Sequence, residues 1–287
     1  MKKETFFSLL VSLLFIACSA DFFDKPIDVD IQENESKLAP TAIFGFINEL
    51  DEEDSSPKIM VSFTQSPFQN PDDELQIIEN ATVELAGNET TYLFEFNEFD
   101  DFYYPLQDIP FNTSQNYTLT ISAPEKQTVI ASQTVPEPVE IINIENTGNH
   151  FLIKINDNPN TRNFYLLKAY KEFEEGNVQS IWLEPFATYM RESSLFFSSI
   201  IFTDTTFNGE QGFNIDVKHN EDNDNTANYK FVLYTITEDF FKYDTSIRIA
   251  EYAEDNPFVE PVIIHSNFQN GYGIFTLMNK TEFNFSF

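Results

Sequence analysis

Carboxylates are the most abundant side chains in this sequence that could do chemistry. The chain has 47 Asp and Glu, 16 Lys and Arg, and three His. Two carboxylates across a cleft could act as acid and base in glycoside hydrolysis, but with so many acids some pairs must lie close by chance. The chain has no G-x-S-x-G elbow, no H-E-x-x-H motif and no Walker A loop, and its histidines, His150, His219 and His265, are followed by Phe, Asn and Ser. We therefore expect no enzyme activity, no catalytic residue and no cofactor.

An acidic turn near residue 222 resembles a calcium-binding loop in composition but differs in spacing. The EF-hand loop has glycine at position 6 and a bidentate glutamate at position 12. With Asp222 as position 1, those positions hold Ala227 and Leu233. We expect a solvated turn and no resident metal, although neighbouring loops could still form an irregular calcium site.

The segment from Phe94 to Phe111, FEFNEFDDFYYPLQDIPF, is rich in both aromatic and acidic residues. Aromatic rings framed by carboxylates could bind a cationic or amphipathic partner. The alternative is a strand, a turn and a second strand whose rings face the core. The candidate binding residues lie at the centre of the segment: Phe99, Asp100, Asp101, Phe102, Tyr103 and Tyr104.

The single cysteine, Cys18, lies where an apolar run ends and acidic residues begin. The chain starts Met-Lys-Lys, and the uncharged run over residues 5–17 is too short to span a bilayer, which is typical of a secretory signal peptide. Residues 15–18, Phe-Ile-Ala-Cys, resemble the lipobox of bacterial lipoproteins, Leu-[Ala/Ser]-[Ala/Gly]-Cys, and differ from it at Phe15 and Ile16.

That resemblance implies a lipoprotein signal peptide over residues 1–17, cleavage before Cys18 and attachment of diacylglycerol to its sulfur. Acyl chains such as palmitate would then anchor the chain in a membrane, because each buried CH₂ contributes about 0.8 kcal/mol. The alternatives are an ordinary signal peptide with a chance cysteine, or a short buried helix. A lipidated cysteine leaves none for a disulfide, so stability must come from a packed core. Residues 18–27 would form a tether, which could also carry an export signal for the outer face of the outer membrane.

The net charge of −31 at pH 7 limits the partners of the chain. Such a surface repels nucleic-acid phosphates and anionic lipid head groups. We therefore expect no nucleic-acid binding, and membrane attachment through outer-membrane lipid on the acylated Cys18 alone. The chain has 41% apolar residues and 32 Phe, which indicates a folded protein because disordered acidic chains are poor in aromatics.

Alternation of apolar and polar residues with a period of two dominates the rest of the chain and predicts half-buried strands. It is clear in NYTLTISA, residues 116–123, and in HFLIKIND, residues 150–157. Pro136 and Pro138 lack the N–H that a sheet ladder needs, which favours a domain boundary there. The predicted fold class is all-β with two β-sandwich domains: an immunoglobulin-like domain at 28–138, a β-rich domain at 139–287, and a short helix near 240–253.

The order of the motifs resembles the outer-membrane lipoprotein family catalogued as domain of unknown function 4249. The resemblance covers nearly all of the chain after Cys18 and is most specific near the end, where the family tends to have Asn-Pro-Phe, Glu-Pro, Ser-Asn and Asn-Gly-x-Gly-Ile-Phe. These motifs stand here at 256–258, 260–261, 266–267 and 270–275, with Thr276 in place of a further glycine. We expect a structural role for this last turn, in which glycine allows positive φ or a close backbone approach; its residues are Asn270, Gly271 and Gly273.

The resemblance implies a location and a partner rather than an activity. Members of the family look like companions of TonB-dependent transporters. We therefore expect a lipid-anchored outer-membrane protein, at the cell surface rather than the periplasmic face, that acts as a non-catalytic accessory or substrate-binding partner of such a transporter. The alternatives are a stand-alone surface adhesin or matrix-binding protein, and a hydrolase with paired carboxylates. The sequence identifies neither the ligand nor the transporter.

Overall fold

A computed structural model describes residues 37–44, 57–64, 75–159, 161–173, 178–220, 228–254 and 262–286. These residues belong to one compact unit, Ser36–Phe287. They form many β-strands, one α-helix and one short 3-10 helix, so the prediction of a mainly β protein with a helix near 240–253 is confirmed. The predictions for the signal peptide, Cys18, the tether and the acidic turn near residue 222 lie outside the described residues.

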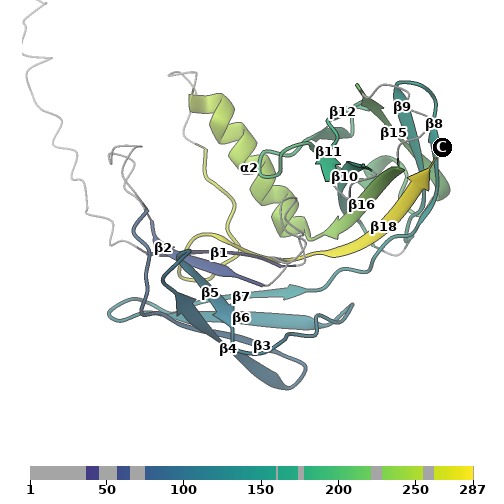
Figure 1. Ribbon diagram of the computed structural model, residues 1–287. Helices are drawn as coiled ribbons and strands as arrows, with labels where there is room; N and C mark the ends of the chain where they lie inside the picture. The colour runs from purple at the N-terminus through teal and green to yellow at the C-terminus, as the bar shows by residue number, and fades with distance from the viewer. Residues whose placement is uncertain are drawn as a thin grey trace, which may run out of the picture. The chain divides into compact units, whose positions relative to one another are not determined.

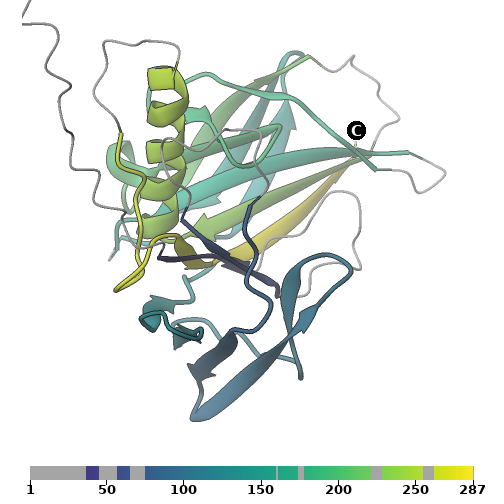
Figure 2. The same ribbon diagram turned by 90° about the vertical axis from the view of Figure 1, so that its left-hand side faces the viewer.

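Eight strands form the first sheet. They are β1 (Leu38–Phe44), β2 (Ile59–Phe63), β3 (Thr82–Gly87), β4 (Thr90–Asn97), β5 (Phe102–Pro105), β6 (Asn116–Ser122), β7 (Val129–Thr134) and β17 (Ile274–Leu277). Their order is β17-β1-β2-β5-β4-β3-β6-β7. The sheet curls, as Figures 1 and 2 show, and an isolated bridge joins Ile130 of the edge strand β7 to Gln269, in the segment just before the other edge strand, β17. It is therefore nearly closed, and we refer to it as the barrel-like sheet.

The sequence pattern explains why these strands curl around a core. In β6 the residues Tyr117, Leu119 and Ile121 are buried, whereas the threonines between them are partly exposed. Val83 and Leu85 of β3 are buried on the same inner side. Burying a side chain such as Leu or Ile contributes about 1.5–3 kcal/mol, so the alternation favours a sheet with one dry face.

Tyr117 ties the start of β6 to the connection that precedes it. Its hydroxyl donates to the carbonyl of Pro110 and accepts hydrogen bonds from Asn88 Nδ2 at 2.8 Å and the backbone N–H of Asn112 at 3.2 Å. This is the arrangement of the tyrosine corner in immunoglobulin-like domains. A Cβ atom on Gly87 would lie 2.1 Å from the Tyr117 ring, so glycine is required there.

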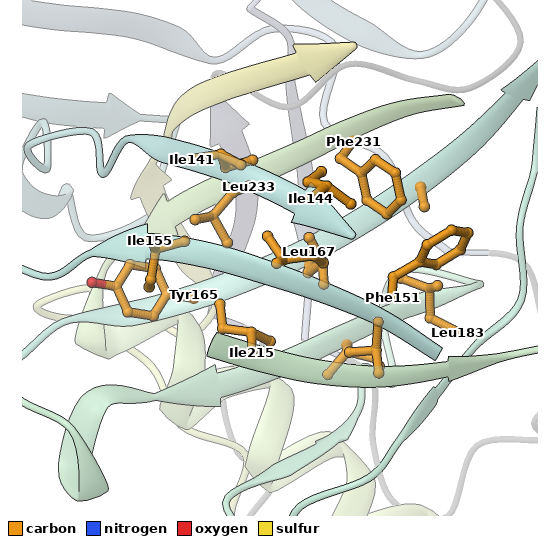
Figure 3. Packing of buried hydrophobic residues seen from close by; sticks show 14 of the residues in the cluster. Ile141, Ile144, Phe151, Ile155, Tyr165, Leu167, Leu183, Ile215, Phe231 and Leu233 are labelled. Carbon is orange, nitrogen blue, oxygen red and sulfur yellow. The ribbon is translucent and has the colours of Figure 1, made fainter. Parts of the chain in front are cut away.

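Two further sheets form a sandwich. The four-stranded sheet has the order β12-β15-β9-β8, and the six-stranded sheet has the order β13-β14-β10-β16-β18, with β11 paired to β10. Figure 3 shows the core between them, in which Ile155 and Ile215 of the four-stranded sheet lie against Tyr165 and Leu167 of the six-stranded sheet. The strands are β8 (Ile141–Asn146), β9 (His150–Asn156), β10 (Phe164–Glu172), β11 (Val178–Ser180), β12 (Leu183–Pro185), β13 (Met190–Glu192), β14 (Ser199–Thr203), β15 (Gln211–His219), β16 (Asn228–Ile236) and β18 (Asn279–Ser286); the 3-10 helix η2 (Asp204–Thr206) follows β14.

The helix α2 (Glu238–Glu254) packs on the outer face of the six-stranded sheet. Phe240 is buried there against Leu166 and Ile201. Thr237 caps the first turn by accepting a hydrogen bond from the backbone N–H of Phe240 at 3.3 Å, and Asp239 places negative charge at the positive end of the helix dipole. Within the described residues, no helix has the length and apolar character needed to cross a membrane.

The connection that contains Pro136 and Pro138 joins the barrel-like sheet to the sandwich. The chain later returns to the first sheet, because β17 pairs in parallel with β1 through partners such as Thr41 and Ile274. Residues after the proposed boundary therefore contribute one strand to the sheet built mainly by residues before it. The division into domains at residue 138 stays a prediction.

Candidate functional site

The turn between β4 and β5 carries the residues predicted to bind a partner. Phe99 is 99% exposed, and the neighbouring Asp100 and Asp101 are exposed as well. Asn97 holds the turn, since its side-chain oxygen accepts the N–H of Phe99 at 3.0 Å and its backbone carbonyl accepts the N–H of Asp101 at 3.1 Å. The result is a defined turn with an apolar tip beside two carboxylates, which we call the aromatic tip (residues 98–101).

The other three predicted residues lie in β5 and differ in their surroundings. Phe102 is half-buried, and the ammonium of Lys58 lies 4.9 Å from its ring centroid. The hydroxyl of Tyr104 donates to Asp100 in the aromatic tip. Tyr103 is only 1% exposed, and its hydroxyl donates to the Ile78 carbonyl at 2.6 Å. Tyr103 is therefore a core residue, and the structure does not bring it to the surface with the other five.

The turn Asn270–Gly273 fits closely against β7 and β1 of the barrel-like sheet. Asn270 and Gly273 have positive φ angles of 65° and 116°. A Cβ atom on Gly271 would lie 2.5 Å from Val129 of β7, and one on Gly273 would lie 2.0 Å from the Pro40 carbonyl oxygen of β1. Glycine is needed at both positions because a larger residue would separate the turn from these strands.

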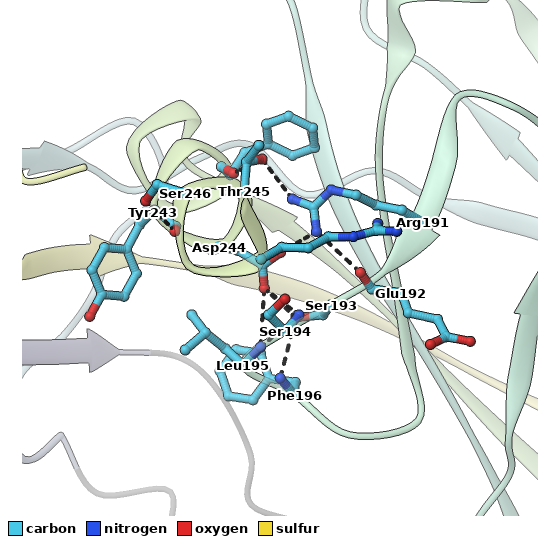
Figure 4. Close-up of polar contacts among 12 residues, drawn as sticks. Arg191, Glu192, Ser193, Ser194, Leu195, Phe196, Tyr243, Asp244, Thr245 and Ser246 are labelled. Atoms are coloured by element: carbon cyan, nitrogen blue, oxygen red, sulfur yellow. Dashed lines mark hydrogen bonds and ion pairs between the residues drawn. The ribbon is translucent and has the colours of Figure 1, made fainter. Parts of the chain in front are cut away.

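A buried ion pair joins α2 to β13 and the loop that follows it (Figure 4). Arg191 of β13 donates to one carboxylate oxygen of Asp244, whose side chain is 0% exposed. The other oxygen accepts hydrogen bonds from the Ser193 hydroxyl at 2.5 Å and from the N–H groups of Ser194 and Leu195 at 3.0 and 3.2 Å. The buried carboxylate is thus fully paired, and it holds the loop against the helix.

A pocket of about 700 Å³ lies beside this ion pair, within the size range of small-molecule sites. One wall is the last turns of α2, with Arg248, Glu251 and Tyr252, and the other includes Met190 and Glu192 of β13. The Arg248 guanidinium donates to the Tyr252 hydroxyl at 3.4 Å and its central carbon lies 5.6 Å from that ring. The pocket, which we call the α2 pocket, combines a guanidinium, two carboxylates and an aromatic ring.

No sequence motif indicates the α2 pocket, because its lining residues come from two segments that lie far apart in the chain. One feature of the amino-acid composition does draw attention to its residues. The chain has only three arginines, Arg162, Arg191 and Arg248. Two of the three line this pocket.

Two buried acids, Asp157 and Asp204, lie near each other and can be compared with the carboxylate pair that a hydrolase would need. Asp157 accepts hydrogen bonds from the Tyr165 hydroxyl and from the N–H of Gly209 at 2.7 Å, and Asp204 accepts one from the N–H of Asn163 at 2.7 Å. Burial raises the pKa of Asp204, and the nearby Asp157 raises it further. Both carboxyl groups are shielded from solvent and bonded within the chain, so they stabilise loops rather than face a cleft.

The side chains of His265 and His219 also make contacts within the fold. His265 Nε2 lies 2.9 Å from Asp239, which also accepts a hydrogen bond from Gln133 of β7 at 2.6 Å. Burial raises the pKa of Asp239, but these hydrogen bonds outweigh burial and hold the pKa below its ordinary value. His219 is buried and stacks on Phe151 with ring centroids 3.9 Å apart. In the part of the chain that the structure describes, no three His, Cys, Asp or Glu side chains are grouped to hold a metal ion.

These features define an all-β protein with a barrel-like sheet, a two-sheet sandwich and a pocket beside its helix. The family described as domain of unknown function DUF4249 matches residues 24–284, and the chain belongs to this family. The family membership predicted from the motifs is confirmed. A comparison with curated proteins found no match.

Proposed function

We propose that this chain is a lipid-anchored outer-membrane protein, exposed at the cell surface, that acts as a non-catalytic accessory or substrate-binding partner of a TonB-dependent transporter. The lipobox-like residues 15–18 support the anchor. Membership of the family over residues 24–284 supports the partnership, which the family resemblance implies. The acidic surface, with a net charge of −31, makes direct binding to anionic head groups unfavourable.

The observation that carries the proposal is the aromatic tip. Phe99 is 99% exposed, and burying such a side chain in a partner contributes about 1.5–3 kcal/mol. Because Asn97 already holds the turn, little conformational entropy is lost on binding. Asp100 and Asp101 favour a partner with basic residues around an apolar pocket, since complementary charge increases specificity and association rate.

The partnership is tested by co-purification of the tagged full chain from native membranes in a mild detergent. The wild-type chain should bring down a TonB-dependent transporter, and Phe99→Ala should reduce its recovery several-fold. Phe197→Ala is the matched control, because Phe197 is also highly exposed, at 72%, but lies in the loop after β13. Repeated isolation of the wild-type chain with no transporter would overturn the proposal.

The anchor is tested separately with Cys18→Ala. This variant should lose incorporation of labelled palmitate and should be released from membranes, because Cys18 is the only thiol in the chain. Continued labelling of the variant would exclude lipidation at Cys18. Protease treatment of intact cells then tests the membrane face, since a surface protein is cleaved and a periplasmic one is protected.

A stand-alone surface adhesin or matrix-binding protein is the second candidate function. It is favoured by an exposed aromatic pair, Trp182 and Phe197, whose rings meet edge to face with centroids 5.1 Å apart. In this case Phe197→Ala, rather than Phe99→Ala, should weaken attachment of cells to a surface. Loss of the gene should then leave nutrient uptake intact.

A further inference from the structure

We propose that the α2 pocket binds a small zwitterionic ligand, an amino acid or short peptide with a free carboxylate and a free ammonium group. The pocket volume of about 700 Å³ accommodates a peptide of a few residues. This inference does not depend on the transporter partnership, because it concerns a site on the chain itself.

Arg248 supplies the carboxylate site. Arg191, the other arginine in the pocket, is already bound to Asp244. Among the described residues, no carboxylate lies within ion-pair distance of Arg248, whose contact with Tyr252 is a long hydrogen bond of 3.4 Å. The planar guanidinium therefore keeps N–H groups that can bind a carboxylate in a bidentate manner.

Two glutamates at the pocket determine which anion fits. Glu192 of β13 and Glu251 of α2 are exposed, and neither forms an ion pair with another described residue. Their negative charges repel a multiply charged anion such as phosphate, but they attract an ammonium group. Since Arg191 and Asp244 compensate each other, the described residues that line the pocket present one available cation and two available anions. A ligand with both charges satisfies this arrangement better than a simple anion does.

The remaining lining favours a ligand with some apolar surface. Met190 and Pro185 provide apolar surface, and the exposed ring of Tyr252 on α2 adds to it. An amino-acid side chain can pack between them while the termini reach Arg248 and the glutamates. Small-molecule sites commonly combine such apolar walls with a few polar groups.

The test is calorimetric titration of the full chain in mild detergent with the peptide Ala-Leu-Ala. Free peptide should bind saturably, whereas the N-acetylated and the C-amidated peptides should each bind about tenfold more weakly or worse, because each lacks one charge. Arg248→Gln should cause a similar loss for the free peptide, and Arg248→Lys a smaller one. Glu251→Gln should weaken binding of the free peptide but not of the N-acetylated one.

The matched control is Lys242→Gln, on the same helix but outside the pocket, where Lys242 pairs with Glu238 at 3.2 Å. It should leave the affinity unchanged, and circular dichroism should show that all variants fold. Absence of saturable binding by millimolar Ala-Leu-Ala would overturn the proposal. So would binding of inorganic phosphate that depends on Arg248 while the peptide does not bind. Neither result bears on co-purification with a transporter, so the two proposals fail independently.

Discussion

Replacement of Asp244 by alanine should destabilise the fold strongly, because its buried carboxylate holds α2 against β13 and the loop that follows it. The change removes the carboxylate from Arg191, whose side chain is only 17% exposed, and from the N–H groups of Ser194 and Leu195. Removing one partner of a buried ion pair costs about 3–5 kcal/mol. The loop after β13 can partly relax toward water, so we expect a loss of about 4 kcal/mol in the free energy of unfolding.

Urea denaturation of the full chain, followed by circular dichroism, measures this loss. Thermal unfolding gives a second measure. In a domain of this size, a loss of 1 kcal/mol in the free energy of unfolding lowers the melting temperature by about 2–4 °C, so the melting temperature of the variant should fall by about 10 °C. Glu238→Ala is the control on the same helix. Glu238 is exposed and, among the described residues, forms an ion pair with Lys242 alone, so its replacement should cost less than about 1 kcal/mol.

A double-mutant cycle tests the reason for the effect. If the cost comes from an unpaired guanidinium, then Arg191→Met combined with Asp244→Ala should be more stable than Asp244→Ala alone. Replacing a buried pair by apolar groups is often tolerated, whereas breaking it is not. A double variant destabilised by the sum of the two single effects would refute the reasoning, because Arg191 and Asp244 would then act independently.

Two further predictions concern backbone fit and pH. Gly273→Ala should destabilise the chain by more than Gly212→Ala in thermal unfolding, although both glycines have positive φ. The new Cβ at Gly273 would lie 2.0 Å from the Pro40 backbone, whereas the one at Gly212 would meet only the flexible end of Lys154, at 2.8 Å. Equal losses of stability in the two variants would contradict this prediction. Burial, and to a lesser extent the nearby His150, lowers the pKa of His219 below its ordinary value of 6.5. As the pH drops below 6.5, the unfolded chain therefore takes up a proton at His219 that the folded chain does not, and the free energy of unfolding should fall. His219→Phe should make urea unfolding depend less on pH in that range, and an unchanged slope would argue against it.

The strands were predictable because the alternation of apolar and polar residues within each strand indicates that one of its faces is buried. In β6, Tyr117, Leu119 and Ile121 alternate with threonines, and this pattern requires no knowledge of the partner strands. The closure of the barrel-like sheet was not predictable in the same way. Its parallel pairing joins Thr41 to Ile274, at nearly opposite ends of the chain, and no local pattern encodes such a contact.

The candidate sites also differ in whether their residues are neighbours in the sequence. The aromatic tip could be recognised because Phe99 and its neighbouring acids are adjacent in the sequence. The core position of Tyr103 was one of two alternatives that the sequence left open, since the alternation in a short strand does not say which side faces the core. The burial of Asp244 could not be predicted, for a different reason. An acid on a helix is normally solvated, and only the position of Arg191 on a distant strand makes its burial favourable.

The same helix carries both the structural ion pair and the wall of the α2 pocket, which affects how variants should be interpreted. Asp244 holds the loop containing Ser193 and Ser194, and both serines also line the pocket. Loss of peptide binding in Asp244→Ala would therefore reflect a displaced wall rather than a lost contact. Arg248→Gln keeps the loop bonded to Asp244, so a loss of binding there, with an unchanged melting temperature, reports the contact between the guanidinium and the ligand itself.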